Sequence, residues 1–325
     1  MVSNMTYILI FIILAILSYV YLKLADRFNI IDKPNHRSSH TQITIRGGGI
    51  IFYIALLIFF ITSGFEYPYL FIGTTIIALV SFIDDLRPQS PALRLPVQFI
   101  AIALAIYQVS LDFPLISLIL LLIVGVGFVN AFNFMDGING ITGMYSIVIV
   151  GFLLFFNIYE ATFVNVDLLY YLLFSLVVFG FYNFRKKALF FSGDVGSISI
   201  AVVLFFLVYQ FYLTLKAPVA ILLVAVYGGV DTVLTIIRRI KMKEKISEAH
   251  RHHLYQLFVD SKQFSHITTS LIYSIIQLLC CIIVYYSFRL GLWEQLLIVT
   301  LVLLSITSSY VFLVRYFLKM RVKAS

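Results

Sequence analysis

The chain alternates between long apolar runs and short polar breaks. Crossing a bilayer as a helix takes roughly 20 apolar residues. Eleven runs approach or exceed this length, at residues 5–24, 49–63, 67–83, 95–109, 115–129, 141–159, 167–181, 198–215, 219–237, 267–288 and 293–318. The second and fourth runs are short, so they need either flanking residues or a locally thinner bilayer. The pattern predicts an all-α, polytopic integral membrane protein with about 11 transmembrane helices.

Composition agrees with this prediction. Hydrophobic residues make up 62% of the 325 residues and charged residues 12%, with a mean hydropathy of +1.02. A soluble domain is about half apolar and a quarter charged, and a disordered chain is poorer still in apolar residues, so both classes are excluded. Cys280 and Cys281 are adjacent, which suits neither a disulfide framework nor a zinc site. The first run lacks a basic leader and a small-residue cleavage site, so we interpret it as a span rather than a signal peptide.

The basic residues indicate the orientation. With the N-terminus outside, 21 of the 23 Lys and Arg fall on the inner side, and only Lys216 and Arg289 fall outside. Because cytoplasmic loops carry the excess of Lys and Arg, we expect a cytoplasmic C-terminus. The net charge of +8 is then a signal of topology, with no nucleic-acid partner expected. All six histidines also fall on the inner side: His36, His40, His250, His252, His253 and His266. We therefore expect the cytoplasmic loops to form the active site of a single transmembrane domain, residues 1–325.

Two adjacent carboxylates, Asp84 and Asp85, end the third run. Carboxylates near hydrocarbon are costly and often functional, and two neighbours repel unless a cation or proton relieves them. The alternative is a solvated acidic pair matched by Arg87 or Arg94. The sequence alone leaves both readings open.

A second candidate segment lies between the fifth and sixth runs. Residues 130–143 carry three Asn, one Asp and three Gly, with Asn133, Asp136 and Asn139 at regular spacing. Such side chains bind a sugar, a phosphate or a metal, and glycine permits close approach of a ligand to the backbone. A helix cap and turn would need only one or two of these residues, so we favour a binding role.

Asp194 stands in a Gly-Asp-Val-Gly-Ser turn that opens the eighth run, shortly after Arg185, Lys186 and Lys187. Backbone amides at a helix start suit phosphate, and a carboxylate is an oxygen ligand of the kind Mg²⁺ prefers. A helix cap is the structural alternative for Asp194, for which we favour function. For the basic trio we favour a membrane anchor.

The fifth inner segment carries Asp231, a basic run, and then His250, His252 and His253. Histidines at this density act as metal ligands, phosphate-binding cations or proton carriers, and a solvated interfacial helix is the alternative. Zinc is the weaker choice, because no cysteine or second ligand pair accompanies them. The first inner loop, residues 32–49, adds His36, His40 and a Gly triplet that serves either ligand approach or close helix packing.

Taken in this order, the segments resemble the polyprenyl-phosphate N-acetylhexosamine-1-phosphate transferase superfamily, glycosyltransferase family 4. The resemblance covers all five inner loops and most of the spans. The Asp-Lys-Pro-Asn-x-Arg-Ser-Ser-His stretch at 32–40, the Arg-Gly-Gly-Gly at 46–49 and the Arg-Leu-x-x-Gln at 94–98 look most like the O-antigen and enterobacterial-common-antigen initiating branch. Ile43 and Ile45 stand where that family usually has prolines.

This resemblance implies transfer of a sugar 1-phosphate from a UDP-N-acetylhexosamine to undecaprenyl phosphate, with release of UMP, at the bacterial inner (cytoplasmic) membrane. It implies that Asp194 coordinates Mg²⁺, with Mn²⁺ as an alternative, and that Asp84 and Asp85 belong to the catalytic centre. The predicted substrate-binding residues are Asn133, Asp136, Asn139, His250, His252, His253 and Arg94. A direct or a covalent two-step mechanism, the sugar, and a monomer or homodimer stay open.

Three other classes fit parts of the pattern. A secondary transporter shares many spans and intramembrane acids, but it predicts polar residues near helix centres and related halves, whereas these acids cluster at the inner ends. A CDP-alcohol phosphotransferase carries an Asp-Gly-x-x-Ala-Arg pattern, whereas Asp136 and Gly137 continue as Ile-Asn-Gly. A scaffold without catalysis has no need for so many carboxylates and histidines on one face.

Overall fold

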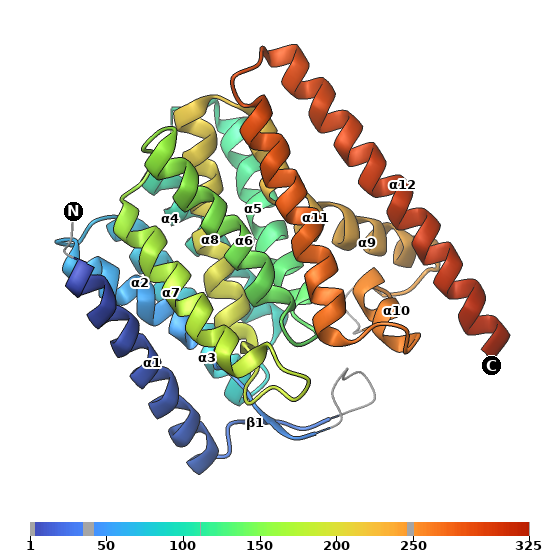
Figure 1. The fold of residues 1–325 in the computed structure, drawn as a ribbon, viewed down its shortest axis with the longest axis horizontal. Helices are drawn as coiled ribbons and strands as arrows, with labels where there is room; N and C mark the ends of the chain where they lie inside the picture. Colours follow the sequence, from blue (N-terminus) through green and yellow to red (C-terminus); the bar gives the residue numbers. More distant parts are fainter. Residues whose placement is uncertain (1–3, 35–41, 111, 246–249, 325) are drawn as a thin grey trace.

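The computed structural model describes residues 4–34, 42–110, 112–245 and 250–324. It is a bundle of helices with one small hairpin (Figure 1). The first half contains α1 (Asn4–Arg27), β1 (Ile31–Asp32), β2 (Thr44–Ile45), α2 (Ile50–Thr62), α3 (Pro68–Leu86), α4 (Pro91–Val109), α5 (Leu115–Met135) and α6 (Ile141–Tyr159). The second half contains α7 (Val166–Asn183), α8 (Gly193–Leu215), η1 (Pro218–Leu223), η2 (Ala225–Asp231), α9 (Thr232–Lys241), α10 (Leu254–Asp260), α11 (His266–Ser287) and α12 (Leu292–Ala324).

Within those described ranges, nine helices are long and apolar enough to cross a membrane, and α2, with 13 residues, is a shorter apolar helix. The chain is therefore a polytopic, nearly all-α membrane protein, as the apolar runs predict. The orientation and the full number of crossings stay predictions.

The ninth predicted helix, residues 219–237, is the exception, because it is not one continuous helix. A 3₁₀ segment, η1, begins at Pro218, a π-helical segment, η2, follows, and α9 completes it. Proline starts the first piece, and the adjacent glycines 228 and 229 weaken the middle one. The break ends at Asp231, a carboxylate that is only 2% exposed. Wide π-helical turns occur often at functional sites.

Helix α8 lies at the centre of the bundle and α12 at its edge. In the apolar window of α8, 67% of the residues are buried, compared with 11% for α12. The two helices stand apart in Figure 1, with α12 as the long red helix on the right. The central position of α8 matters because its first turn carries Asp194.

One end of the bundle gathers the segments that the sequence singles out. In Figure 1, the β1 hairpin, the α7–α8 connection and α10 all lie at the lower end. The hairpin pairs Ile31 with Ile45, and Ile45 forms a parallel bridge with Phe190. We call this the basic end, because it carries Arg46, Arg94 and the 185–187 trio. The other end, with Glu66, Glu160 and Asp167, is the opposite end.

Candidate active site

Asp85 joins the end of α3 to the start of α8. Its two carboxylate oxygens accept hydrogen bonds from the backbone N–H of Asp194 (2.9 Å) and of Val195 (3.0 Å). A negative charge is favoured at a helix start, where N–H groups lack partners within the helix. Arg46 Nε lies 2.6 Å from the same carboxylate. Asp85 thus caps α8 from a distant part of the chain.

Glycines make this contact feasible. Gly193 has a φ of +69°, and a Cβ built there would lie 2.5 Å from Asp85 Oδ2. Gly49 and Gly196 bring the starts of α2 and α8 together, since a Cβ on Gly196 would lie 2.6 Å from Gly49 Cα. The Gly49 N–H also donates to Ser192 O (2.9 Å). The Gly triplet therefore packs two backbones against each other at the base of the site.

Two arginines bridge three carboxylates here. Arg94 Nη1 lies 2.7 Å from Asp84 Oδ2 and 3.4 Å from Asp194 Oδ2, while Arg46 Nη2 lies 3.4 Å from Asp194 Oδ1. Asp84 also accepts the Gln89 N–H (2.5 Å), and it interacts directly with Asp194. We call Asp84, Asp85, Asp194, Arg46 and Arg94 the aspartate cluster. It comes from the β2–α2 turn, α3, α4 and α8.

Asp194 is the member of the cluster held least tightly. Both of its arginine contacts are 3.4 Å long, and its side chain is 15% exposed, against 6% for Asp84 and 0% for Asp85. Three carboxylates against two guanidinium groups leave one formal negative charge. A third cation, or a proton, is what such a buried group attracts.

The Asn-rich segment reaches the same helix start. Asn133 Oδ1 accepts a hydrogen bond from Ser197 Oγ (2.8 Å), and Asp136 accepts one from Ser192 Oγ. Ser192 is the N-cap of α8, yet its hydroxyl serves Asp136 instead of its own helix. Burial raises the pKa of Asp136. Asn133 and Asp136 therefore contact residues on either side of Asp194 in the chain, and their predicted role in substrate binding stays a prediction.

Asn139 holds a neighbouring turn. Its side-chain Nδ2 donates to Arg185 O (2.8 Å), and its backbone O accepts from Ser270 Oγ (2.8 Å). It lines a cavity of about 530 Å³ that Lys186 and Lys187 also line. The basic trio, which the sequence interprets as an anchor, thus includes two lysines at a polar cavity.

The histidine-rich segment forms a separate cluster. The rings of His250 and His252 stack with centroids 5.7 Å apart, and those of His250 and His253 lie 5.0 Å apart. His252 Nε2 lies 3.1 Å from Glu244 Oε1. Burial, followed by the nearby charge of His253, lowers the pKa of His250 to about 3, so its ring is neutral near pH 7.

Tyr255 connects the histidine-rich segment to the Asn-rich loop. Its hydroxyl donates to Phe134 O (3.1 Å), and a Cβ on Gly137 would lie 2.1 Å from that hydroxyl. Burial raises the pKa of Tyr255, and the carboxylates of Asp231 and Asp136 raise it further. The histidine cluster is therefore packed against the loop that carries Asp136.

The side-chain oxygen and nitrogen atoms present decide whether this site can hold a metal ion. Among the described residues, no group of three or more His, Cys, Asp or Glu side chains is arranged as a ligand set. Mg²⁺, however, is usually held by one or two carboxylates together with waters and substrate phosphates. The adjacent oxygens of Asp84 and Asp194 fit that donor set.

The structure adds residues that the sequence does not assign. Arg46 pairs with two carboxylates, and the only signal for it is its place before the Gly triplet. Asp231 contacts His253 across the break in the ninth predicted helix. His36 and His40, noted in the first loop, lie outside the described residues.

Comparison with known proteins matches the part of the chain that carries most of this site. The family model for glycosyl transferase family 4 matches residues 67–212, which span α3 to α8 and include three carboxylates of the aspartate cluster. This match supports the resemblance to the polyprenyl-phosphate N-acetylhexosamine-1-phosphate transferase superfamily that the motifs indicate.

A relative with a more particular description is a "Probable undecaprenyl-phosphate N-acetylglucosaminyl 1-phosphate transferase" of Bacillus subtilis (strain 168). It is 26% identical over 285 residues, which cover 79% of this chain and 78% of the relative.

Proposed function

We propose that this protein transfers N-acetylhexosamine 1-phosphate from a UDP-sugar to undecaprenyl phosphate. The oxygen of the lipid phosphate forms a bond to the β-phosphorus of the UDP-sugar, the bond from that phosphorus to the bridging oxygen breaks, and UMP leaves. The observation that carries the proposal is the aspartate cluster. It joins carboxylates and arginines from four separate segments at one end of a membrane bundle.

The aspartate cluster suits a reaction between two anions. Catalysis of phosphoryl transfer is mostly positioning and electrostatic stabilisation, since negative charge spreads over the transferred group. Arg46 and Arg94 supply fixed positive charge at the site, and Asp85 holds Arg46 and the first turn of α8 in place. Asp85 is thus a positioning residue in this scheme, whereas Asp84 and Asp194 face the reacting groups.

Mg²⁺ is proposed as the cofactor, with Mn²⁺ as an alternative. Asp194 and Asp84 would hold it, because their oxygens are close together and Asp194 has the weakest contacts within the cluster. When bound, Mg²⁺ neutralises phosphate charge and orients the leaving group. Asp84 would either deprotonate the lipid phosphate for a direct attack or take part in a covalent two-step transfer.

The substrates approach from different surroundings. The cavity of about 530 Å³ beside Asn139 is lined by Lys186, Lys187 and Phe191, and Phe191 directly precedes the N-cap of α8 in the chain. The cavity suits the nucleotide part of an anionic, water-soluble donor. The undecaprenyl chain stays in the bilayer, and its phosphate reaches the site at the membrane boundary.

The finer assignments follow the same proposal. The basic end faces the cytoplasm of a bacterial inner membrane, where UDP-sugars are available. The first-loop motif favours the branch that initiates O-antigen-like polysaccharides, and the name of the Bacillus subtilis relative makes UDP-N-acetylglucosamine the first donor to test.

The test is a panel assay. Purified protein is incubated with Mg²⁺, undecaprenyl phosphate and a series of UDP-sugars, and UMP release is measured with and without the lipid. We expect lipid-dependent UMP release with at least one N-acetylated sugar, and loss of release when EDTA removes the metal. Absence of UMP with every sugar contradicts the proposal.

A further inference from the structure

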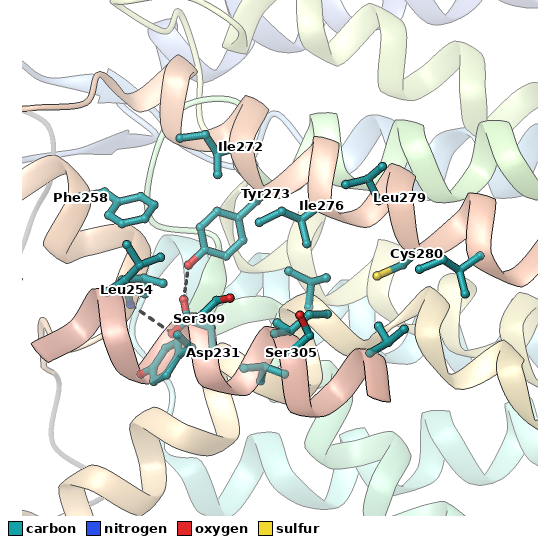
Figure 2. A pocket seen from close by; sticks show the side chains of 17 residues that line it. Asp231, Leu254, Phe258, Ile272, Tyr273, Ile276, Leu279, Cys280, Ser305 and Ser309 are labelled. Carbon is teal, nitrogen blue, oxygen red and sulfur yellow. Dashed lines mark hydrogen bonds between the residues drawn. The ribbon is translucent and has the colours of Figure 1, made fainter. Parts of the chain in front are cut away.

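Asp231 is a buried carboxylate outside the aspartate cluster. It ends η2 and lies at one end of an apolar cavity of about 340 Å³ between η2, α11 and α12 (Figure 2). Its oxygens accept hydrogen bonds from Tyr273 Oη (2.5 Å), the Leu254 N–H (3.2 Å) and Thr235 Oγ1 (3.2 Å). The fourth contact is His253 Nδ1, at 3.1 Å from Oδ1. Oδ1 accepts three of these contacts and Oδ2 one, and hydrogen bonds to a carboxylate favour its ionised form.

The contact between Asp231 and His253 determines that Nδ1 of the His253 ring carries a proton. An ionised carboxylate only accepts hydrogen bonds, so Nδ1 of His253 must carry a proton. The other ring nitrogen, Nε2, is then either a bare acceptor or, in the charged ring, a donor. In the doubly protonated ring both nitrogens donate hydrogen bonds, so Nε2 can bind a phosphate oxygen while Nδ1 stays on Asp231.

Nε2 of His253 is buried and has no hydrogen-bond partner within the described structure. The residue itself is 2% exposed. Two further buried atoms near it share this condition, namely His250 Nδ1 and Arg238 Nη1. His250 stacks beside His253, and Arg238 donates to the backbone O of His252. Buried polar atoms are nearly always paired, so three unpaired atoms from α9 and the residues just before α10 point to a polar ligand.

We infer that Asp231 is a positioning residue, which holds the His253 ring so that Nε2 donates a hydrogen bond to a phosphate oxygen of the bound substrate. The inference rests on the proposed transferase function for the identity of that phosphate. The break in the ninth predicted helix places Asp231 at the start of α10, where His253 lies. Tyr255 then ties the same segment to the loop of Asp136.

A double-mutant cycle separates this role from a purely structural one. Asp231→Asn keeps the size of the side chain but removes the charge and presents an N–H₂ group that competes with His253 Nδ1–H. We expect kcat/KM to fall roughly 10- to 100-fold, as for other residues that orient a functional histidine. His253→Gln should cause a similar loss, and the double variant should be no worse than about twofold below His253→Gln alone. Asp231→Glu should recover part of the activity.

The matched control is Ser309→Ala. Ser309 lines the same cavity as Asp231. Its substitution should leave kcat/KM within about twofold of the wild type. If Asp231 serves only in packing, the losses in kcat/KM caused by Asp231→Asn and by His253→Gln should multiply in the double variant. Multiplying losses overturn the inference.

A spectroscopic arm does not depend on turnover. The protein is labelled with ¹⁵N-histidine in detergent micelles, and the His253 signals are assigned by their loss in His253→Gln. We expect Nδ1 to be protonated in the wild type, this proton to be lost or exchanged in Asp231→Asn, and inorganic pyrophosphate to shift the Nε2 signal. A bare Nδ1 in the wild type, or no response to pyrophosphate, overturns the inference. Failure of the proposed function is seen separately, as an absence of UMP release by the wild type.

Discussion

The two ends of the helical bundle use the same kinds of residues differently. At the opposite end, acids occur one at a time: Glu160 pairs with Arg289 and Tyr285, Asp167 accepts from Tyr7 (2.5 Å), and Glu66 accepts from Asn165. At the basic end, Asp84, Asp85 and Asp194 converge on two arginines. Single acid–donor pairs are what helix ends at a membrane surface require, whereas three gathered carboxylates incur a repulsion that a structural role does not explain.

Asp194 and Asp167 make this comparison testable, because each lies in the first turn of a helix, α8 and α7. We predict that Asp194→Asn lowers UMP release by at least about a thousandfold, because it removes the charge proposed to hold Mg²⁺. Asp167→Asn should change the rate less than about twofold. Both rates are measured on purified protein of equal purity and helix content by circular dichroism. An active Asp194→Asn variant removes Asp194 from the metal site.

Arg46 and Arg289 form the second pair of variants. Arg46→Ala leaves Asp85, whose side chain is fully buried, without its cation, which we expect to lower the free energy of unfolding by about 2 kcal/mol. This figure lies below the range for fully buried pairs because Arg46 is 30% exposed. Arg289, at 73% exposure, should contribute less than about 1 kcal/mol. Thermal unfolding in detergent compares Arg46→Ala with Arg289→Ala. Equal unfolding midpoints would show that the arginines at the two ends of the bundle stabilise the protein equally.

Gly196 and Gly151 test the close packing below the site. A Cβ on Gly196 meets the backbone of Gly49 at 2.6 Å, while one on Gly151 in α6 has no atom within 4 Å. Gly196→Ala should destabilise the protein by roughly 1–3 kcal/mol, the range for overpacking. Gly151→Ala should be neutral or slightly stabilising, because alanine favours a helix. The same unfolding assay measures both, and a stable Gly196→Ala variant argues against tight contact of α2 with α8.

The smallest expected effect concerns pH. His250 has a pKa of about 3 in the folded protein, compared with 6.5 when unfolded, so the unfolded chain binds the extra proton first as the pH falls. The contribution of the neutral His250 ring to the free energy of unfolding is fully present above pH 6.5. It is lost progressively as the pH falls from 6.5 to 3. We expect His250→Gln to flatten the decline of the unfolding midpoint between pH 7 and 5 relative to the wild type. If the midpoint declines equally steeply with falling pH in both proteins, burial does not lower the pKa of His250.

Much of the fold follows from the lengths of the apolar runs alone. Ten of the eleven predicted helices exist as helices, because each is a run of apolar side chains whose backbone groups must be satisfied within the segment in lipid. The ninth prediction is wrong in detail, since residues 219–237 are equally apolar but contain adjacent glycines and a buried Asp231. Hydrophobicity does not reveal a π-helical turn that is stabilised by hydrogen bonds to α10 and α11.

The site is predicted in its residue types but not in its pairings. Asp84, Asp85 and Asp194 are visible as carboxylates at helix ends, yet nothing in the sequence shows that Asp85 caps α8 through two backbone N–H groups. Arg46 and Asp231 acquire their meaning only from partners far away in the chain. Asn139 is predicted to line the substrate pocket, and in the structure it lines a cavity while its side chain donates a hydrogen bond to the backbone O of Arg185. Its binding role stays a prediction.

Product analysis tests the central claim most directly. Wild-type protein and Asp194→Asn are each incubated with Mg²⁺, undecaprenyl phosphate and UDP-N-acetylglucosamine, and the lipid and nucleotide products are identified by mass spectrometry. The account predicts a lipid diphosphate sugar and an equal amount of UMP from the wild type, and neither from the variant. Release of UDP with a lipid monophosphate sugar, or equal product from both proteins, would contradict it.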